Sequence, residues 1–196
     1  MSVVLYMSMS LDGFIAGPGD DLDHGLGVGG ERLHDWLAAG DGSPGSFRPA
    51  SGPNATVFDE MMQTGAVITG RRTFELARGW GGDHHDGVPV FVLTRSEPAD
   101  PAPGHARYAT DAAACVAEAR AAAADRDVMV HGAVTAQSML RAGLLDELAI
   151  QLMPLLLGQG RRLFDDLPPE LHELELLRSL EGPDVLHLRY RVGKAS

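Results

Sequence analysis

The stretch Val128-Met-Val-His-Gly-Ala-Val-Thr-Ala136 decides the fold class of this chain. Its apolar, β-branched run predicts a strand that ends at His131, and the pattern from Ala133 to Arg141 predicts a helix. Gly132, between them, would let the backbone approach a phosphate closely, because the free N–H groups of the first helical turn point toward it. One such junction is common in α/β proteins, so it indicates an anion site only together with others.

Two further segments repeat this arrangement. Ala66-Val-Ile-Thr-Gly-Arg-Arg-Thr73 predicts a strand, a glycine and a helix start that carries two arginines. Val90-Phe-Val-Leu-Thr-Arg-Ser96 predicts a strand that ends in polar residues. Open α/β sheets bind nucleotides at the carboxyl ends of their strands. The three segments therefore predict a nucleotide site where three neighbouring strands end.

The order of the predicted elements gives the architecture. Strands and helices alternate along the first three quarters of the chain, and two strands at 173–180 and 185–192 flank the turn 181–184. This order predicts an α/β fold, a three-layer αβα sandwich whose mixed, mostly parallel sheet ends in an antiparallel C-terminal hairpin. We expect a single domain over residues 1–196, with a lid-like insertion at about 17–54. Helices are expected at 31–39, 55–63, 71–78 and 133–142, and in an alanine-rich stretch capped by Thr110.

Composition limits the partners. The chain has 196 residues and a formal net charge of −11, which argues against nucleic acid and anionic membranes as partners. Its single cysteine, Cys115, allows no internal disulfide and fits a small buried side chain in a reducing compartment. The apolar runs are too short to span a bilayer, and the N-terminus has no basic segment of the signal-peptide type. We therefore expect a cytoplasmic protein.

Several segments, in this order, carry a resemblance to a known family. They are Ser8-Met-Ser-Leu-Asp-Gly-Phe-Ile-Ala16, Gly70-Arg-Arg-Thr-Phe74, Val92-Leu-Thr-Arg95, His131-Gly-Ala-Val134 and Gly143-Leu-Leu-Asp-Glu-Leu148. Together they resemble the dihydrofolate reductase-like family, and most closely the branch that contains the reductase domain of bacterial riboflavin biosynthesis. Pro154-Leu-Leu-Leu-Gly-Gln-Gly-Arg-Arg-Leu-Phe164 is also similar to that branch. One departure is Ala133, which stands where the family often has a second glycine.

The resemblance implies NADPH as cofactor. The matching family segments hold the cofactor's pyrophosphate and adenosine 2′-phosphate, and arginine suits this role because its planar fork binds phosphate through two hydrogen bonds. The hydroxyl and guanidinium groups of 94–96 would form the pocket for the 2′-phosphate. The residues assigned to cofactor binding are Gly70, Arg71, Arg72, Thr73, Thr94, Arg95, Ser96, Gly132, Ala133, Val134 and Thr135.

The resemblance also places Asp12 at the active cleft, as the candidate catalytic residue and a substrate contact. A plain turn is the alternative for Asp12, because Asp-Gly after a strand is a turn signal. Phe14 and Trp80 are further candidates for substrate binding, and Trp80 lies among glycines, where a core role is hard to explain. In true dihydrofolate reductases an acid binds the pterin at a position that aligns with Thr56 here, with Asp59 and Glu60 a turn later. Folate is therefore not the expected substrate.

Asp83-His84-His85-Asp86 is the one segment that suggests a metal site. Adjacent histidines on a loop rarely converge on one ion, so we expect a loop at the rim of the cleft and no metal requirement.

These observations predict an NADPH-dependent reductase. It would transfer hydride to a small planar substrate of the aminopyrimidine or pteridine type, similar to 5-amino-6-(5-phosphoribosylamino)uracil reductase. A non-catalytic NADPH-binding sensor or regulatory module is the alternative, and a plain nucleotide or sugar-phosphate-binding domain is a third hypothesis.

We also expect a homodimer, because similar family members pair through the C-terminal strands and those strands are rich in leucine and valine.

Overall fold

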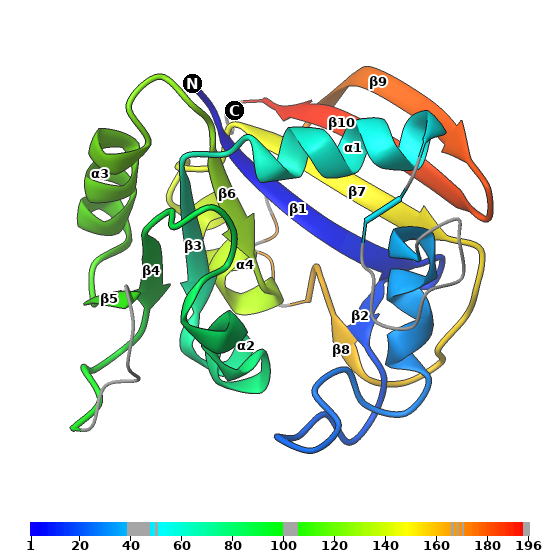
Figure 1. The fold of residues 1–196 in the computed structure, drawn as a ribbon, viewed down its shortest axis with the longest axis horizontal. Helices are drawn as coiled ribbons and strands as arrows, with labels where there is room; N and C mark the ends of the chain where they lie inside the picture. The colour runs from blue at the N-terminus through cyan, green and yellow to red at the C-terminus, as the bar shows by residue number, and fades with distance from the viewer. Residues whose placement is uncertain are drawn as a thin grey trace.

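The fold is built on one eight-stranded sheet of order β5-β4-β3-β6-β1-β7-β10-β9, seen in a computed structural model that describes residues 1–38, 48–49, 51–99, 106–165, 167, 169 and 171–193 (Figure 1). All neighbouring pairs from β5 to β7 are parallel, and β10 runs antiparallel to both β7 and β9. The strands are β1 Val3–Ser10, β3 Ala66–Gly70, β4 Val90–Leu93, β5 Ala106–Ala109, β6 Val128–His131, β7 Glu147–Met153, β9 Leu174–Gly182 and β10 Val185–Val192.

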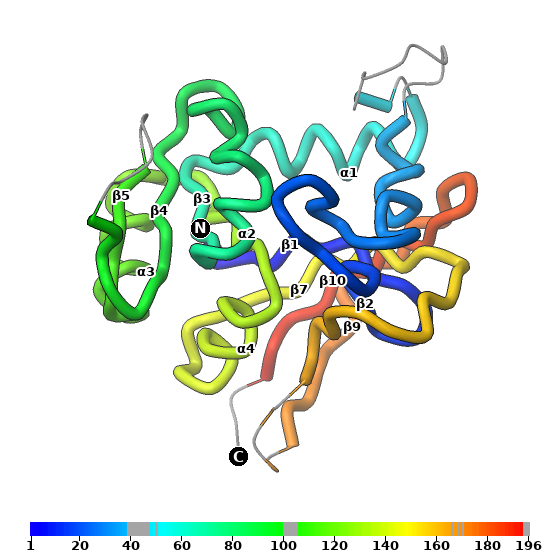
Figure 2. Tube along the Cα trace, turned by 90° about the horizontal axis from the view of Figure 1, so that it is seen from below, coloured from blue at the N-terminus to red at the C-terminus, as the bar shows by residue number. Residues whose placement is uncertain are grey.

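Helices cover both faces of this sheet. α3 (Ala112–Ala123) and α4 (Ala133–Arg141) pack on one face, where Val3, Leu5 and Val130 are buried. α1 (Gly52–Met62) and α2 (Arg71–Leu76) contribute side chains to the opposite face, and α1 and α4 lie on opposite sides of the strands (Figure 2). Successive strand residues alternate between these two faces. The three-layer αβα fold with an antiparallel hairpin is therefore confirmed.

The predicted lid begins as an ordered segment. β2 (Phe14–Ala16) pairs with β8 (Arg161–Arg162), and the chain then folds back through hydrogen bonds from Gly17 N to Leu26 O (2.8 Å) and from Val28 N to Pro18 O (3.0 Å). η1 (Gly30–Leu37) follows as a 3₁₀ helix, where a short helix was predicted at 31–39. Residues 39–47 and 50 of the predicted insertion lie outside the described residues.

Three local details differ from or support the sequence-based expectations. The alanine-rich helix α3 is capped by Asp111, whose carboxylate accepts a hydrogen bond from Ala114 N at 2.7 Å, and the expectation of Thr110 as the cap was wrong. β5 was not predicted, because it is a short edge strand without a buried residue. The expected C-terminal cap of α4 is present: Gly143 has φ +64° and Leu144 N donates to Met139 O at 2.9 Å.

No helix within the described parts of the chain combines the length and the apolar character needed to cross a bilayer.

Candidate nucleotide site

The three predicted junctions lie side by side. β6 pairs with β3 and β3 pairs with β4, all parallel, so their carboxyl ends meet at one edge of the sheet. α2 begins directly after β3 and α4 begins one residue after β6, so two helix N-termini also meet there. The sequence-based expectation that these segments share one edge is confirmed.

Two Gly-x-x-Thr segments interlock at this edge. A Cβ added to Gly70 would lie 2.7 Å from Thr135 Oγ1, and one added to Gly132 would lie 2.6 Å from Thr73 Oγ1. Each threonine thus lies over the glycine of the other segment. Gly132 also has φ +92°, a conformation that favours glycine. The absence of both side chains lets the two helix starts approach each other at these glycines.

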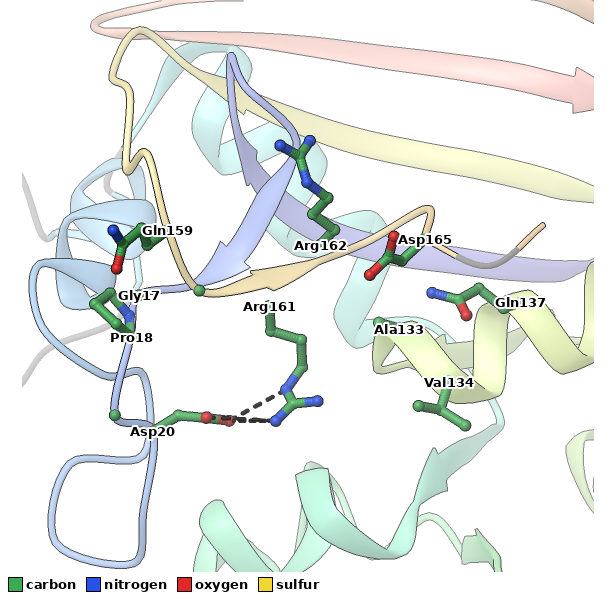
Figure 3. Close-up of a pocket in the computed structure, with 12 residues that line it drawn as sticks. Gly17, Pro18, Asp20, Ala133, Val134, Gln137, Gln159, Arg161, Arg162 and Asp165 are labelled. Atoms are coloured by element: carbon green, nitrogen blue, oxygen red, sulfur yellow. Dashed lines mark hydrogen bonds and ion pairs between the residues drawn. The ribbon is translucent and has the colours of Figure 1, made fainter.

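A cavity of about 440 Å³ lies beside the start of α4 (Figure 3). Three segments line it: the loop after β2, the first turns of α4 and the chain around β8. Of the predicted cofactor residues, Ala133 and Val134 line this cavity. Polar residues that the sequence analysis did not assign to the site complete the wall, namely Asp20, Gln137, Gln159, Arg161, Arg162 and Asp165.

Asp20 lies between two arginines at this cavity. Its Oδ2 accepts hydrogen bonds from Arg72 Nε at 3.1 Å and from Arg161 Nη2 at 3.1 Å, the latter drawn in Figure 3. Burial raises the pKa of the Asp20 carboxyl, but the two guanidinium groups outweigh burial and hold this pKa below its usual value. The side chain is 13% exposed. A carboxylate therefore occupies the point where two cationic side chains converge, which is a position suited to a phosphate.

The other predicted phosphate ligands are dispersed. Arg71 forms an ion pair with Glu75 within α2, at 2.7 Å, so its guanidinium is already paired inside the helix. Thr94 Oγ1 donates to Ser96 O at 3.0 Å, and Arg95 and Ser96 are exposed beyond the end of β4. These three residues follow the strand next to β3, so they extend the same edge of the sheet away from the cavity.

The Asp12 carboxylate anchors a loop. It accepts hydrogen bonds from Ser10 Oγ (2.6 Å), Leu157 N (3.1 Å) and Gly158 N (2.7 Å). These hydrogen bonds, the one from Ser10 foremost, lower the pKa of the Asp12 carboxyl. Asp12 therefore joins the turn after β1 to the chain that leads into β8. This geometry accounts for the turn alternative, and the Asp12 carbonyl accepts a hydrogen bond at 3.0 Å from Arg162, which lines the cavity.

Phe14 and Trp80 lie in different surroundings. Phe14 is buried, and the Arg162 guanidinium covers its ring at 4.4 Å. Trp80 packs on the rings of His84 and His131, with centroid distances of 4.6 and 6.0 Å. The structure thus brings Phe14 together with Arg162 at the cavity and places Trp80 on a histidine cluster at the end of β6.

The carboxylates of α1 are already paired. Glu60 accepts two hydrogen bonds from Arg178, both 2.6 Å, and Asp59 pairs with Arg48 at 3.0 Å. Thr56 Oγ1 donates a hydrogen bond to the Gly52 carbonyl within the helix.

Within the residues described, no group of three or more His, Cys, Asp or Glu side chains is arranged to hold a metal ion. The lack of a metal requirement remains a prediction.

The sheet order and its antiparallel C-terminal hairpin are those of the dihydrofolate reductase-like α/β fold. Residues 1–188 match the family model of the RibD C-terminal domain, and the chain belongs to this family.

Solved structures share this fold. A protein from Shewanella sp. PV-4 whose name links it to riboflavin biosynthesis is similar with a TM-score of 0.71 and 22% identity, over 99% of this chain and 100% of that one. A pyrimidine reductase-like protein from Corynebacterium diphtheriae has a TM-score of 0.62 and 13% identity, over 98% and 92%. The deaminase/5-amino-6-(5-phosphoribosylamino)uracil reductase of Thermotoga maritima has a TM-score of 0.59 and 16% identity, over 98% of this chain and 56% of that one. No curated protein sequence matches the chain significantly.

Proposed function

We propose that this chain is an NADPH-dependent reductase of small planar, aminopyrimidine- or pteridine-like substrates, working as a cytoplasmic homodimer. The observation that carries the proposal is the interlocked pair of Gly-x-x-Thr helix starts beside a cavity with converging arginines. Family membership supports a pyrimidine reductase-like reaction, as do the names of the solved structures that share the fold. The direct test is loss of NADPH absorbance with a panel of aminopyrimidines, pteridines and quinones.

The residues present fit the cofactor. In our proposal the N–H groups at the start of α4, with Arg72 and Arg161, bind the pyrophosphate, and Thr94 to Ser96 bind the 2′-phosphate. When bound, the nicotinamide would supply the hydride. The chain around Asp12 and the lid would position the substrate ring against it and exclude water, since reaction requires approach to about 3–3.5 Å.

A non-catalytic NADPH-binding module is the second candidate function. It is favoured by one observation: both oxygens of Asp12, the carboxylate assigned to catalysis, already accept hydrogen bonds from the loop before β8. Tight NADPH binding without turnover on any member of the substrate panel would support this module over the reductase.

Asp20→Asn is expected to tighten NADPH binding by about three- to tenfold, because the neutral amide competes less well with a phosphate for Arg72 and Arg161. An ion pair near the surface contributes up to ~1 kcal/mol. Calorimetric titration of NADPH measures this change. Asp23→Asn is the matched control on the same loop, because the Asp23 side chain is 86% exposed and lies 3.9 Å from Arg78. Weaker binding by Asp20→Asn would show that Asp20 builds the site and does not compete for it.

The chain is expected to sediment as a dimer of about twice 20.8 kDa at micromolar concentration. The motivation is the free edge strand β9 with its partner β10, where Leu174, Leu176 and Leu186 are exposed. Leu176→Lys should give a monomer. Leu22→Lys, at a residue that is 61% exposed on the lid, should not. A wild-type monomer would refute this part of the proposal.

A further inference from the structure

Three histidine rings form a continuous row of hydrogen bonds from the central sheet to the loop after η2 (Arg78–Gly82). His131 Nδ1 lies 3.0 Å from the Tyr6 carbonyl oxygen, and His131 Nε2 lies 3.1 Å from His84 Nε2. His84 Nδ1 lies 2.7 Å from His85 Nδ1, and His85 Nε2 lies 3.2 Å from the Thr64 carbonyl oxygen. Every ring nitrogen of the row thus faces a polar atom.

Counting protons shows what this row requires. A carbonyl oxygen only accepts, so both ends of the row need an N–H, and each nitrogen-to-nitrogen contact needs one proton between its two atoms. The four contacts therefore need four protons. Three neutral imidazoles carry only three N–H groups. A row that satisfies all four contacts therefore holds one proton more than the neutral rings supply.

The Thr64 hydroxyl offers the neutral row another solution. Its Oγ1 lies 2.8 Å from the Met61 carbonyl oxygen and 3.4 Å from His85 Nε2, and it has one proton to donate. If the hydroxyl donates to His85, all three rings are satisfied without an added proton. If the row gains a proton, His85 donates to the Thr64 carbonyl and the hydroxyl donates to Met61. The two states differ by one proton and by the direction of one hydroxyl.

We propose that His131, His84 and His85 form a proton-binding site that takes up a single shared proton, and that the Thr64 hydroxyl reverses its hydrogen bond when the proton binds.

The surroundings restrict the row to one proton and set the direction of its titration. Burial, with repulsion between the rings, lowers the pKa of His84 to about 2 and that of His131 to about 4. The groups that face the row are basic: His34 from η1 acts on His131, and Arg126 Nη1 lies 3.5 Å from the Thr64 carbonyl. Tyr6, from β1, faces the row through its carbonyl, and its phenol has a pKa raised to about 12, chiefly by burial.

The loop's own acids, Asp83 and Asp86, are exposed, and Asp83 accepts hydrogen bonds from Gly87 N. Within the described residues no carboxylate forms an ion pair with a ring of the row. Burial therefore favours the neutral forms of His84 and His131, so the proposed uptake of a proton by the row requires acid, below the usual histidine pKa of about 6.5.

The proton would sit next to the candidate nucleotide site. His131 immediately precedes Gly132, and Trp80 packs on both His84 and His131. A cation on these rings would attract the indole face and fix the loop that carries Trp80 against the sheet. The row thus links protonation to the position of Trp80, and this link does not depend on the reductase proposal.

Thr64→Val tests the hydroxyl switch. Valine keeps the shape of a side chain that is 1% exposed but removes the donor that completes the neutral row. In the protonated state the lost hydroxyl donates to the Met61 carbonyl, which still accepts a hydrogen bond from Thr64 N at 3.3 Å. The substitution therefore destabilises the neutral row more than the protonated row. The midpoint of proton uptake should rise by about 0.4 to 1.1 pH units, the equivalent of one net hydrogen bond. Thr64→Ser, which retains a hydroxyl, should titrate like the wild type. An unchanged or lower midpoint in Thr64→Val would overturn the switch.

Nitrogen-15 NMR of the histidine rings in the full chain, between pH 7.5 and 2.5, supplies the readout. His131, His84 and His85 should change together with one midpoint and one proton among them. His84→Gln interrupts the row and should remove the common midpoint, whereas His24→Gln, at an exposed ring paired with Asp21, should leave it intact. Three independent titrations in the wild type, or a common midpoint that survives in His84→Gln, would contradict the shared proton.

Discussion

Gly132→Ala is expected to lower NADPH affinity tenfold or more and to reduce the free energy of unfolding by about 1–3 kcal/mol. Two effects combine at this position. The backbone has φ +92°, which strains any residue with a side chain, and the added Cβ would lie 2.6 Å from Thr73 Oγ1. Relief of that contact would push α2 away from the start of α4. Denaturant unfolding and NADPH titration of the same preparation measure the two effects separately.

Gly143→Ala separates backbone strain from damage to the site. Gly143 has φ +64°, but no atom lies within 4 Å of a Cβ built on it. This variant should therefore lose about 1 kcal/mol of stability from the left-handed backbone alone and keep its NADPH affinity within twofold. If both variants lose affinity equally, the contact between Gly132 and Thr73 does not shape the cofactor site.

Asp12→Asn is expected to lower turnover about tenfold or more and to change NADPH affinity less than threefold. The substitution keeps the shape and removes the negative charge, which we propose accepts a hydrogen bond from an amino-substituted substrate ring. Asp12 lies at the turn after β1 and bonds to the chain before β8, whereas the interlocked glycines lie at the ends of β3 and β6. Steady-state kinetics at saturating NADPH, with a separate NADPH titration, give the two numbers.

Two other outcomes for Asp12→Asn are distinguishable. Loss of NADPH binding with unchanged substrate kinetics would place Asp12 on the cofactor side. A lower melting temperature with both binding steps unchanged would mean that Asp12 only holds the turn. The hydrogen bonds from Leu157 and Gly158 make thermal melting a necessary measurement, because they go to different oxygens of Asp12 and asparagine replaces one of these oxygens with an NH₂ donor.

The core of the fold and part of the site could be predicted because their signals are local. A β-branched run, a glycine and a helical period mark β3–α2 and β6–α4 in the sequence, and parallel pairing then brings Gly70 and Gly132 to one edge. The exposed leucines of β9 and β10 are also a local feature, because side chains alternate between the two faces along a strand. β5 gave no such signal, since it is short and its residues are not buried.

The rest of the site depends on contacts between residues far apart in sequence. Asp20 meets Arg72 across 52 residues and Arg161 across 141, and both contacts depend on how the segment after β2 folds back. Trp80 was assigned to the substrate on the basis of its glycine neighbours, but its position on His84 depends on a loop with left-handed backbone at Trp80 itself. The ion pair of Arg71 with Glu75 is the opposite case: its i,i+4 spacing on a helix is local, so it could be predicted from the sequence.

The central claim, that the edge formed by β3, β4 and β6 binds NADPH, is tested most directly by calorimetric titration of the full chain with NADPH and with NADH. The 2′-phosphate is proposed to bind the hydroxyl and guanidinium groups of Thr94, Arg95 and Ser96, and charge-assisted hydrogen bonds contribute about 1.5–3 kcal/mol each. We predict one site per chain that binds NADPH at least tenfold more tightly than NADH. Equal dissociation constants for the two cofactors, or no binding of NADPH, would contradict the account.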